Sequence, residues 1–496
     1  MDIVISGLNS LMDPVVILLM CIGVIIGIII GSLPGLTDPM ALGLAVPFTF
    51  GMEPVAAILF LLALHFGAVY GGSITAILIN TPGTPAGAAA ALDGYPLTQK
   101  GMSRKALQMS AISAFVGATI SAIALILFSP LIAKVALKFG PSEYFALGIF
   151  GLSVVAGIAG KSLNKALISA ILGVFIALIG SDPLYGGERF TFGSHFLYAG
   201  IDLVTALIGL FAVSEILKKF YSKNEDQENK VNTPTGKGLS KTEFRKGFKT
   251  MVKGGGIGTL IGALPGTGAV ISSFLSYGEE VRSSKNPEKY GKGELNGVAA
   301  AESGAIGTES AAMIPLLTLG IPGDVATAIL LGAFKLHDVN IGPDLFEKSG
   351  DIVYAMFIGI IILEFLVFFS GWYGSSIISK IIKVKNKYLY PIILILVVSG
   401  TFALMNNLFN VWIAIGIGIL GFLMLVFDYP LAPLLLGLIL GPIVEENFLL
   451  AMSASEGNIF EIITKPLTAA ILILALITMF FSIRIQRRTQ KRLNIE

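Results

Sequence analysis

Apolar residues along this chain are gathered in long uninterrupted stretches that are separated by short polar loops. Many of these stretches approach about 20 residues, the length at which an α-helix crosses a bilayer, and they lack the alternation of a membrane β-barrel. Residues 14–30 and 106–128 are two examples. The pattern predicts an all-α polytopic membrane protein with roughly 12–15 membrane segments, some of them too short to span alone.

One apolar stretch is interrupted in a way that a simple spanning helix would not be. Residues 71–92 read GGSITAILINTPGTPAGAAAAL, with Pro82 and Pro85 inside the stretch. Proline removes a backbone donor and clashes with the preceding turn, so we expect the helix to break between Asn80 and Pro85. Lipid cannot satisfy the freed backbone groups, which must therefore face protein or a watery cavity. Such a broken helix is typical of a transporter binding site.

The same design occurs a second time. Residues 318–331 read TLGIPGDVATAILL, and a Leu-Pro-Gly triplet lies upstream of each broken stretch. The two Leu-Pro-Gly copies are 265 − 34 = 231 residues apart, and the two Pro-Gly copies that follow them are 322 − 82 = 240 apart. Two ordered features at nearly one offset predict an internal duplication, each half of which carries two broken segments.

A polar segment separates the predicted halves. Residues 218–253 contain ten Lys or Arg and four Asp or Glu, which predicts a basic cytoplasmic linker between N-terminal and C-terminal transmembrane repeats at 1–217 and 254–496. The loop at 51–54 has no basic residue, whereas the corresponding loop at 279–294 has four. Because basic loops stay in the cytoplasm, the repeats should have inverted topology, with the N-terminus outside and the C-terminus inside.

Composition narrows the class of protein. Of the 496 residues, 54% are hydrophobic and 13% are charged, against roughly 25% charged in soluble proteins. The net charge of +2 indicates no nucleic-acid partner, and the single Cys21 excludes an internal disulfide. The glycine-rich runs lack the Gly-Lys-Ser/Thr of a phosphate loop, and the three histidines are too far apart for a zinc site. We expect neither an enzyme nor a cofactor beyond a coupling ion, Na⁺ or H⁺.

The broken segments supply donors for an anion. Free N–H groups at the N-terminus of a half-helix, the helix dipole and Ser or Thr hydroxyls all favour a carboxylate. The candidate substrate-binding residues are Ser73, Asn80, Thr81, Gly83, Thr84, Ser303, Thr308, Pro322, Gly323 and Thr327. For each hydroxyl the alternative is a hydrogen bond to a backbone carbonyl of its own helix.

Ion coupling has its own candidates. Unwound carbonyls near the Leu-Pro-Gly triplets would suit Na⁺, and acids at membrane depth suit a proton or a cation. The candidates are Leu33, Pro34, Gly35, Leu264, Pro265, Gly266, Glu302, Glu309 and Asp324. Glu302 and Glu309 are seven residues apart, so they should share one helix face. We expect His65 to be packed or hydrogen-bonded rather than a proton relay, and Glu364 to be interfacial or paired with Lys.

Four blocks of the sequence resemble the large permease subunit of tripartite tricarboxylate transporters, the TctA type. The blocks are GSLPGLTDPMALGLAVPFTFGMEPVAA (31–57), YGGSITAILINTPGTPAGAAAALDGYPL (70–97), GTLIGALPGTGAVISSFLSYG (258–278) and AAMIPLLTLGIPGDVATAILLGAF (311–334). The resemblance implies a cation-coupled importer of di- or tricarboxylates in a prokaryotic inner membrane. It also implies a small four-helix membrane partner and an extracytoplasmic binding protein that delivers the substrate.

The chain departs from the family pattern at two places. Thr37-Asp38-Pro39 follows the first Leu-Pro-Gly-Leu where the family continues with glycine, and Glu302 to Glu309 carry two acids where the family has paired Asn. These departures bear on the substrate and the coupling ion. Two alternatives therefore stay open: a cation/proton antiporter that uses these acids, and a non-transporting receptor or scaffold subunit of the membrane.

Overall fold

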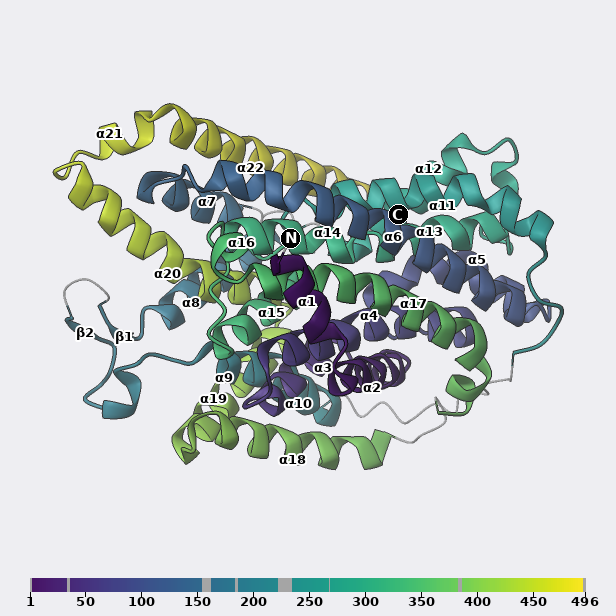
Figure 1. The fold of residues 1–496 in the computed structure, drawn as a ribbon, viewed down its shortest axis with the longest axis horizontal. Helices are drawn as coiled ribbons and strands as arrows, with labels where there is room; N and C mark the ends of the chain where they lie inside the picture. The colour runs from purple at the N-terminus through teal and green to yellow at the C-terminus, as the bar shows by residue number, and fades with distance from the viewer. Residues whose placement is uncertain are drawn as a thin grey trace. The chain divides into compact units, whose positions relative to one another are not determined.

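The computed structural model describes residues 2–33, 36–153, 162–182, 186–221, 234–266, 268–381 and 386–493 (Figure 1). Helices make up nearly all of its regular structure. Two short strands, β1 (Gly180–Ser181) and β2 (Glu188–Arg189), form one antiparallel pair. The predicted all-α class is therefore confirmed. The candidate residues Pro34 and Gly35 lie outside the described residues.

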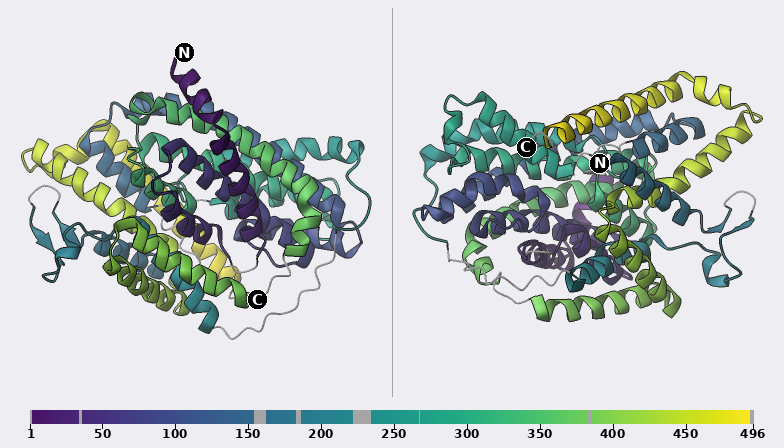
Figure 2. Two further views of the ribbon diagram at one scale, coloured as in Figure 1. Left: turned by 60° about the horizontal axis from the view of Figure 1, so that its bottom comes forward. Right: turned by 180° about the vertical axis from the view of Figure 1, so that it is seen from behind.

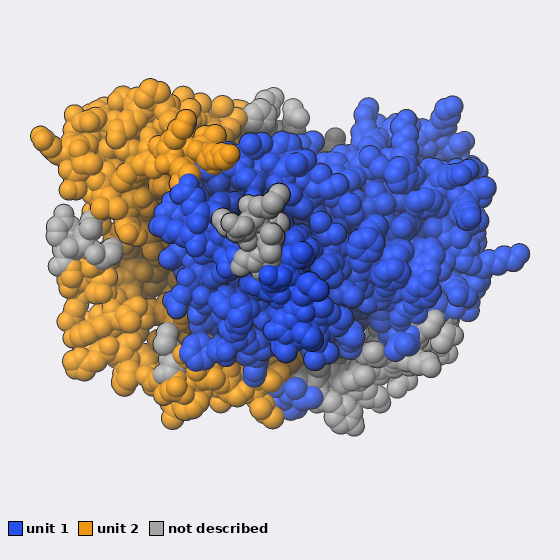
Figure 3. Space-filling model, viewed as in Figure 1, with its two compact units in different colours: residues 1–133, 224–392 blue, residues 134–223, 393–496 orange. Residues whose placement is uncertain are grey.

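The chain forms two compact units, each assembled from two separate stretches (Figure 3). Unit 1 comprises residues 1–133 and 224–392, and unit 2 comprises residues 134–223 and 393–496. Each unit thus takes one stretch from either half of the chain. The predicted repeats describe duplication along the sequence, whereas the units describe packing in space, so the repeat boundaries stay a prediction.

Unit 1 holds both broken segments. Its elements are α1 (Asp2–Leu11), α2 (Pro14–Gly31), α3 (Asp38–Ala45), η1 (Val46–Thr49), α4 (Pro54–Ile79), η2 (Pro85–Gly87), α5 (Ala88–Gln99), most of α6 (Ser103–Ala136), α11 (Lys241–Gly262), α12 (Gly268–Ser283), η6 (Pro287–Lys289), α13 (Leu295–Ile306), α14 (Glu309–Leu319), α15 (Val325–Leu336), α16 (Leu345–Lys348) and α17 (Gly350–Ile381).

Unit 2 is built from the middle and the end of the chain. Its elements are α7 (Pro141–Ser153), α8 (Leu163–Ala177), β1, β2, η4 (His195–Leu197), α9 (Leu203–Leu207), η5 (Ile208–Val213, a π-helical turn), α10 (Ser214–Tyr221), most of α18 (Asn386–Met405), α19 (Leu408–Val426), α20 (Leu431–Ala454), α21 (Ile459–Thr464) and α22 (Pro466–Leu493). Within this unit, α20 packs against α7 and α8, and α22 packs against α7 (Figure 2).

Six of the described helices are long and apolar enough to cross a membrane. They are Pro14–Gly31, Pro54–Ile79, Ser103–Ala136, Gly350–Gly374, Leu408–Val426 and Leu431–Ala454, and four shorter apolar helices accompany them. The span Pro54–Ile79 is almost wholly buried, whereas only a third of Leu408–Val426 is buried. The first therefore lies at the centre of unit 1, and the second presents most of its surface outward.

Glycines let two pairs of helices in unit 1 pack backbone to backbone. On α2, a Cβ added at Gly27 would press on the carbonyl oxygen of Leu64 in α4. On α11, a Cβ at Gly258 would press on the carbonyl oxygen of Gly304 in α13. These contacts are related by 258 − 27 = 231 and 304 − 64 = 240 residues, the two offsets found in the sequence. The same offsets relate Gly23–Phe60 to Gly254–Ala300 and Gly31–Ala68 to Gly262–Thr308.

Candidate functional site

The first break lies where the prolines predict it. Helix α4 ends at Ile79, and its C-cap Asn80 adopts left-handed backbone angles (φ 54°, ψ 27°), which Asn tolerates better than most residues. Regular helix resumes with η2 and α5 after Thr84. Asn80 is exposed, and the Thr81 hydroxyl donates to the carbonyl of Ile79 (3.3 Å). The broken helix in this stretch is therefore confirmed.

The chain that follows the break folds back onto α4. The Gly83 N–H donates to the carbonyl of Gly72 (3.2 Å), and a side chain at Gly83 would strike the carbonyl oxygen of Gly31. Thr84 is 4% exposed, and its hydroxyl has no hydrogen-bond partner. A buried hydroxyl without a partner is costly. Thr84 is thus a polar group that a ligand at this break would satisfy.

The second break has the same outline but different chemistry. Helix α14 ends at Gly320, which is also left-handed (φ 69°), and α15 begins after Asp324. The Asp324 carboxylate accepts hydrogen bonds from the amide and the hydroxyl of Thr327 (both 2.8 Å). The protein's own carboxylate therefore occupies the helix N-terminus at which the sequence predicted a substrate anion. Pro322 and Gly323 are buried behind it.

The second Leu-Pro-Gly turn meets the second break directly. The Gly266 N–H donates to the carbonyl of Gly323 (2.6 Å), and Pro265 is buried beside it while Leu264 is exposed. In the first half, buried Leu33 ends the turn after α2. Each half thus brings its two interrupted segments together.

Three other candidates have their polar atoms engaged or enclosed. The Ser303 hydroxyl donates to the carbonyl of Ala299 (2.7 Å), and the Thr308 hydroxyl donates to that of Gly304 (3.0 Å). Both are the helix-internal bonds that the sequence offered as the alternative to substrate binding. Ser73 is buried on α4, facing Glu302.

A cluster of titratable side chains lies at the centre of unit 1. The Nδ1 atom of His65 makes a hydrogen bond of 2.9 Å with Asp38 Oδ2. Its Nε2 atom lies 2.6 Å from Glu309 Oε2, which is within ion-pair distance although the geometry is not that of a linear hydrogen bond. His65 is 2% exposed and Glu309 is 3% exposed. His65 is therefore hydrogen-bonded, as expected, but its two acidic partners are separated from it by 27 and 244 residues and were not foreseen.

Asp38, Glu309 and the nearby Asp324 all lie at the N-terminus of a helix. Asp38 is the first residue of α3, Glu309 is the first residue of α14, and Asp324 caps α15. Asp324 acts electrostatically on both of the other carboxylates. Helix N-termini stabilise negative charge. The N-terminal residues of α3 and α14 therefore meet at His65 of α4, and the N-terminus of α15 lies near enough to act on both of their acids.

Comparison with known proteins decides the family. The tripartite tricarboxylate transporter TctA family matches residues 17–436. The chain belongs to this family. It is 36% identical over 481 residues to a protein of Agrobacterium vitis described as "Uncharacterized 52.8 kDa protein in TAR-I ttuC' 3'region", covering 95% of this chain and 93% of that protein. A second protein of that organism, "Uncharacterized protein in TAR-II ttuC' 3'region", is 36% identical over 237 residues, 46% of this chain and 93% of its own length. No solved structure matches.

Membership establishes the coarse function. A TctA protein is a component of a tripartite tricarboxylate transporter, and the apolar helices of this chain make it a multi-pass membrane protein. The family is one of transporters and not of enzymes. The resemblance drawn from the four sequence blocks is confirmed.

In this TctA chain, Glu302 lies outside the cluster around His65. It is 1% exposed, and its nearest polar neighbours are Ser73 and Ser110. The expectation that Glu302 and Glu309 share one helix face is wrong, because α13 ends at Ile306 and α14 begins at Glu309. Because a turn separates the two helices, a spacing of seven residues does not place Glu302 and Glu309 on one face. The two acids belong to separate clusters.

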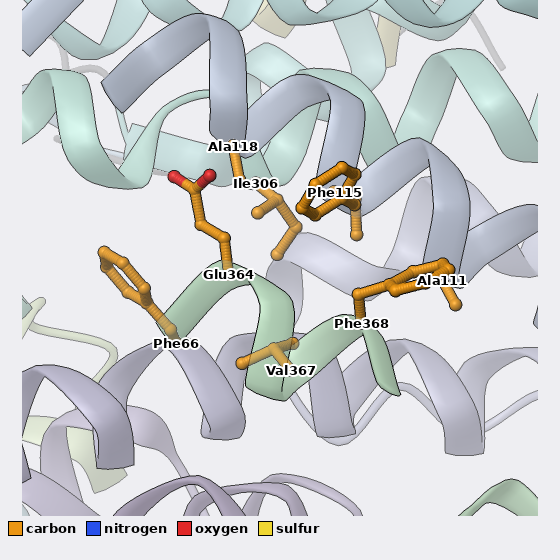
Figure 4. Close-up of a pocket in the computed structure, with 9 residues that line it drawn as sticks. Phe66, Ala111, Phe115, Ala118, Ile306, Glu364, Val367 and Phe368 are labelled. Atoms are coloured by element: carbon orange, nitrogen blue, oxygen red, sulfur yellow. The ribbon is translucent and has the colours of Figure 1, made fainter. Parts of the chain in front are cut away.

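Glu364 on α17 is a buried acid whose position was predicted wrongly. It is 4% exposed, it accepts a hydrogen bond from Thr119 (3.3 Å), and none of the described lysines is paired with it. Its carboxylate reaches into an apolar cavity of about 20 Å³, room for one water molecule (Figure 4). The other lining residues are Phe66, Ala111, Ala114, Phe115, Ala118, Ile306, Val367 and Phe368. In the sequence, Glu364 is surrounded by hydrophobic residues of an apolar stretch, and this pattern did not predict that its side chain is buried.

Asp93, in the Leu-Asp-Gly-Tyr-Pro run at residues 92–96, is bonded to residues of the second half of the chain. Its carboxylate is fully buried and accepts hydrogen bonds from the amides of Gly293 (2.7 Å) and Glu294 (2.8 Å) and from the hydroxyl of Tyr277 (2.9 Å). These residues lie about 200 positions away, at the start of α13 and on α12. The acid of the first half thus ties two helices of the second half to α5.

Two carboxylates outside the candidate spans, Glu243 and Glu279, are each paired with basic residues. Partial burial opposes the charge on Glu243, but hydrogen bonds from Lys105 (2.7 Å) and Ser240 outweigh it and lower the pKa of Glu243 to about 2. Hydrogen bonds from Arg282 and Lys253 likewise lower the pKa of Glu279 to about 2. The start of α11, within the segment predicted to be a linker, is therefore anchored to α6. Among the described residues, no cluster of His, Cys, Asp and Glu fits a metal ion.

Proposed function

We propose that this chain imports an organic di- or tricarboxylate by secondary active transport, coupled to Na⁺ or H⁺. The observation that carries the proposal is the pair of matched breaks: α4 and α14 both stop at a left-handed residue, and each is followed by Pro-Gly and a new helix. Interrupted helices in corresponding positions of two halves mark the binding site of a secondary transporter. Family membership supports the proposed substrate class.

The substrate carboxylate binds at the first break. Thr84 offers a buried hydroxyl without a partner, and the N-terminal end of α5 beyond Gly87 carries no side-chain cap. An anion placed there gains the helix dipole and the Thr84 hydroxyl, while the N–H groups of Gly87 and Ala88 already donate to the carbonyls of Thr84 and Pro85. Gly83 keeps the backbone within reach, because any side chain would fill the space beside Gly31. The second break is a weaker candidate, since Asp324 already occupies its N-terminus.

Alternating access follows from inverted repeats. The glycine contacts of α2 with α4 and of α11 with α13 recur at the offsets of the sequence repeat, which supports duplicated helix pairs. Inverted copies would let one site open to either side of the membrane in turn. The Lys and Arg distribution favours an outer N-terminus and a cytoplasmic C-terminus.

Partners follow from the tripartite family. We expect a small four-helix membrane subunit and an extracytoplasmic binding protein, both in a prokaryotic inner membrane. One alternative function has an observation in its favour: the buried acids around His65 suit a cation/proton antiporter without a carboxylate substrate. A receptor or scaffold subunit would bind the acid without moving it.

The experiment is ligand-induced thermal stabilisation of the purified protein with citrate, succinate, malate and tartrate, each in Na⁺ and in K⁺ buffer. A ligand of the folded state raises the melting temperature by mass action. Thr84→Val should abolish the shift. The matched control is Thr401→Val, because the Thr401 hydroxyl of unit 2 is buried and bonded to its own helix (2.6 Å). The absence of a shift with every acid would leave antiport as the better account.

A further inference from the structure

We propose that Asp38, His65 and Glu309 form the proton-coupling site of this transporter, closed when two protons are shared among the three side chains and opened by the loss of one. The inference rests on the proposed transport function and names its coupling ion. It adds a role for His65 that the sequence did not predict, and it separates Glu309 from Glu302.

Counting protons shows why the closed cluster needs two. Both ring nitrogens of His65 lie against carboxylate oxygens, at 2.9 Å from Asp38 and 2.6 Å from Glu309. Each contact requires a proton on one of the two atoms, because lone pairs on nitrogen and oxygen would otherwise repel at these distances. An imidazolium with two carboxylates satisfies this requirement, and so does a neutral ring with one carboxylic acid. Both arrangements carry a net charge of −1.

Losing one proton to water breaks one N–H or O–H bond and leaves a net charge of −2. One ring nitrogen then faces a carboxylate with no proton between them, inside a core where charge repulsion is poorly screened. His65 is 2% exposed, so water does not replace the lost contact while the cluster stays closed. The deprotonated cluster must therefore separate, and rebinding of a proton lets it close again.

The surroundings favour a net charge of −1. The N-termini of α3, α14 and α15 point their dipoles at the cluster, which offsets about one negative charge. Asp324 of α15 adds repulsion to Asp38 and Glu309, and no Lys or Arg in the described residues acts on the three side chains. Helix α2, packed against α4, carries no acid or base other than Cys21, and the remaining buried acids of unit 1, Asp93, Glu302 and Glu364, are not among the groups with the largest effect on His65.

The cluster lies where its opening would reach the substrate. Asp38 begins the helix that follows the first Leu-Pro-Gly, and His65 is on the helix that ends at the first break. Glu309 begins the helix that ends at the second break, so the contact joins the interrupted segments of the two halves. The protonated, closed cluster would therefore join both breaks while the loaded carrier reorients, and its opening would be needed only when the empty carrier returns.

The test uses the full-length protein in liposomes that contain a pH-sensitive dye. Citrate, succinate, malate and tartrate are each supplied as labelled acid for counterflow, and proton entry is recorded with acid-driven uptake. Wild type should show counterflow and proton entry together. Glu309→Gln keeps a donor toward His65 and cannot release a proton, so we expect counterflow to continue while proton entry falls by about tenfold or more. Asp38→Asn should behave in the same way.

Glu143→Gln is the matched control, because Glu143 is a buried acid of unit 2 that accepts from Thr468 (2.9 Å) and from the Gly140 amide (2.9 Å). Glu143→Gln should retain both counterflow and proton entry. Counterflow by wild type without proton entry would overturn the coupling site and leave the transport function standing, as would unchanged proton entry in Glu309→Gln and Asp38→Asn. If wild type shows no counterflow with any of the four acids, both the function and the inference that rests on it are overturned.

Discussion

Asn80 and Gly320 are 320 − 80 = 240 residues apart, and each ends a buried helix in the left-handed backbone conformation. Pro-Gly follows each of them after one residue, and the next helix begins within the next few residues. The two halves of the chain therefore stop and restart a helix in the same manner. The residue that follows each Pro-Gly changes the chemistry, with Thr84 in one half and Asp324 in the other.

The backbone at Asn80 gives a first prediction. Left-handed angles cost a β-branched residue about 1–2 kcal/mol, whereas Asn and Gly adopt them readily. Asn80→Val should therefore lower the melting temperature, and Asn80→Gly should leave it close to wild type. Gly320→Asn should be tolerated and Gly320→Val should not. Equal losses for Val and Gly at position 80 would show that the side chain, rather than the backbone, holds the helix end.

The close approach of α2 to α4 gives a second prediction. A methyl group at Gly27 would overlap the carbonyl of Leu64, so Gly27→Ala should destabilise the protein by about 1–3 kcal/mol, and Gly258→Ala should do so in the equivalent pair. Gly256→Ala on α11 is the control, since nothing lies within 4 Å of the added methyl. It should stabilise by about 0.4–1 kcal/mol. Thermal unfolding in detergent measures all three, and a loss at Gly256 equal to that at Gly27 would count against backbone packing.

Asp93 gives a third prediction, about the tie between the halves. Asp93→Ala leaves two part-buried amides and the Tyr277 hydroxyl without their acceptor and should cost about 3 kcal/mol. Tyr277→Phe removes one of these bonds and should cost about 1 kcal/mol. Thermal unfolding of both variants checks the ranking. A Tyr277→Phe loss as large as that of Asp93→Ala would place the tie in the Tyr277 hydroxyl alone rather than in the full set of bonds to the carboxylate.

Glu243 gives a prediction about pH. Its folded-state pKa of about 2 is below the unfolded value, so its ion pair with Lys105 contributes stability that is fully present above about pH 4.3 and is lost as the pH falls toward 2. Glu243→Gln should lower stability by about 1 kcal/mol at neutral pH, and the difference from wild type should shrink on acidification. The control is Glu461→Gln, since Glu461 is exposed on α21 and has no ion pair in the described structure. A difference that grows on acidification would contradict the assignment.

Local chemistry explains which features could be predicted. The apolar stretches gave the helical membrane class, and Pro82 and Pro85 gave the break because proline acts on its own turn of helix. The sequence also placed Asp324 beside the second break, where it caps α15. Such features depend on neighbours a few residues away, which a single sequence displays.

The acid cluster depends on contacts that the sequence does not display. Asp38 of α3 and Glu309 of α14 reach His65 from two helices, one in each half of the chain, and nothing near position 65 indicates either partner. The seven-residue spacing of Glu302 and Glu309 misled, because it assumes one helix where Gly307 interrupts two. The assignment of single hydroxyls to substrate stays a prediction, and the bonded states of Ser303 and Thr308 weigh against those two.

The most direct test of the account is counterflow of labelled citrate, succinate, malate or tartrate into liposomes that contain only this protein and the unlabelled acid. The account predicts a transient accumulation of label above equilibrium for at least one of the four acids, lost in Thr84→Val and kept in Thr401→Val. Correctly folded wild-type protein that gives no accumulation with any of the four acids would contradict the claim that this chain carries a carboxylate across the membrane.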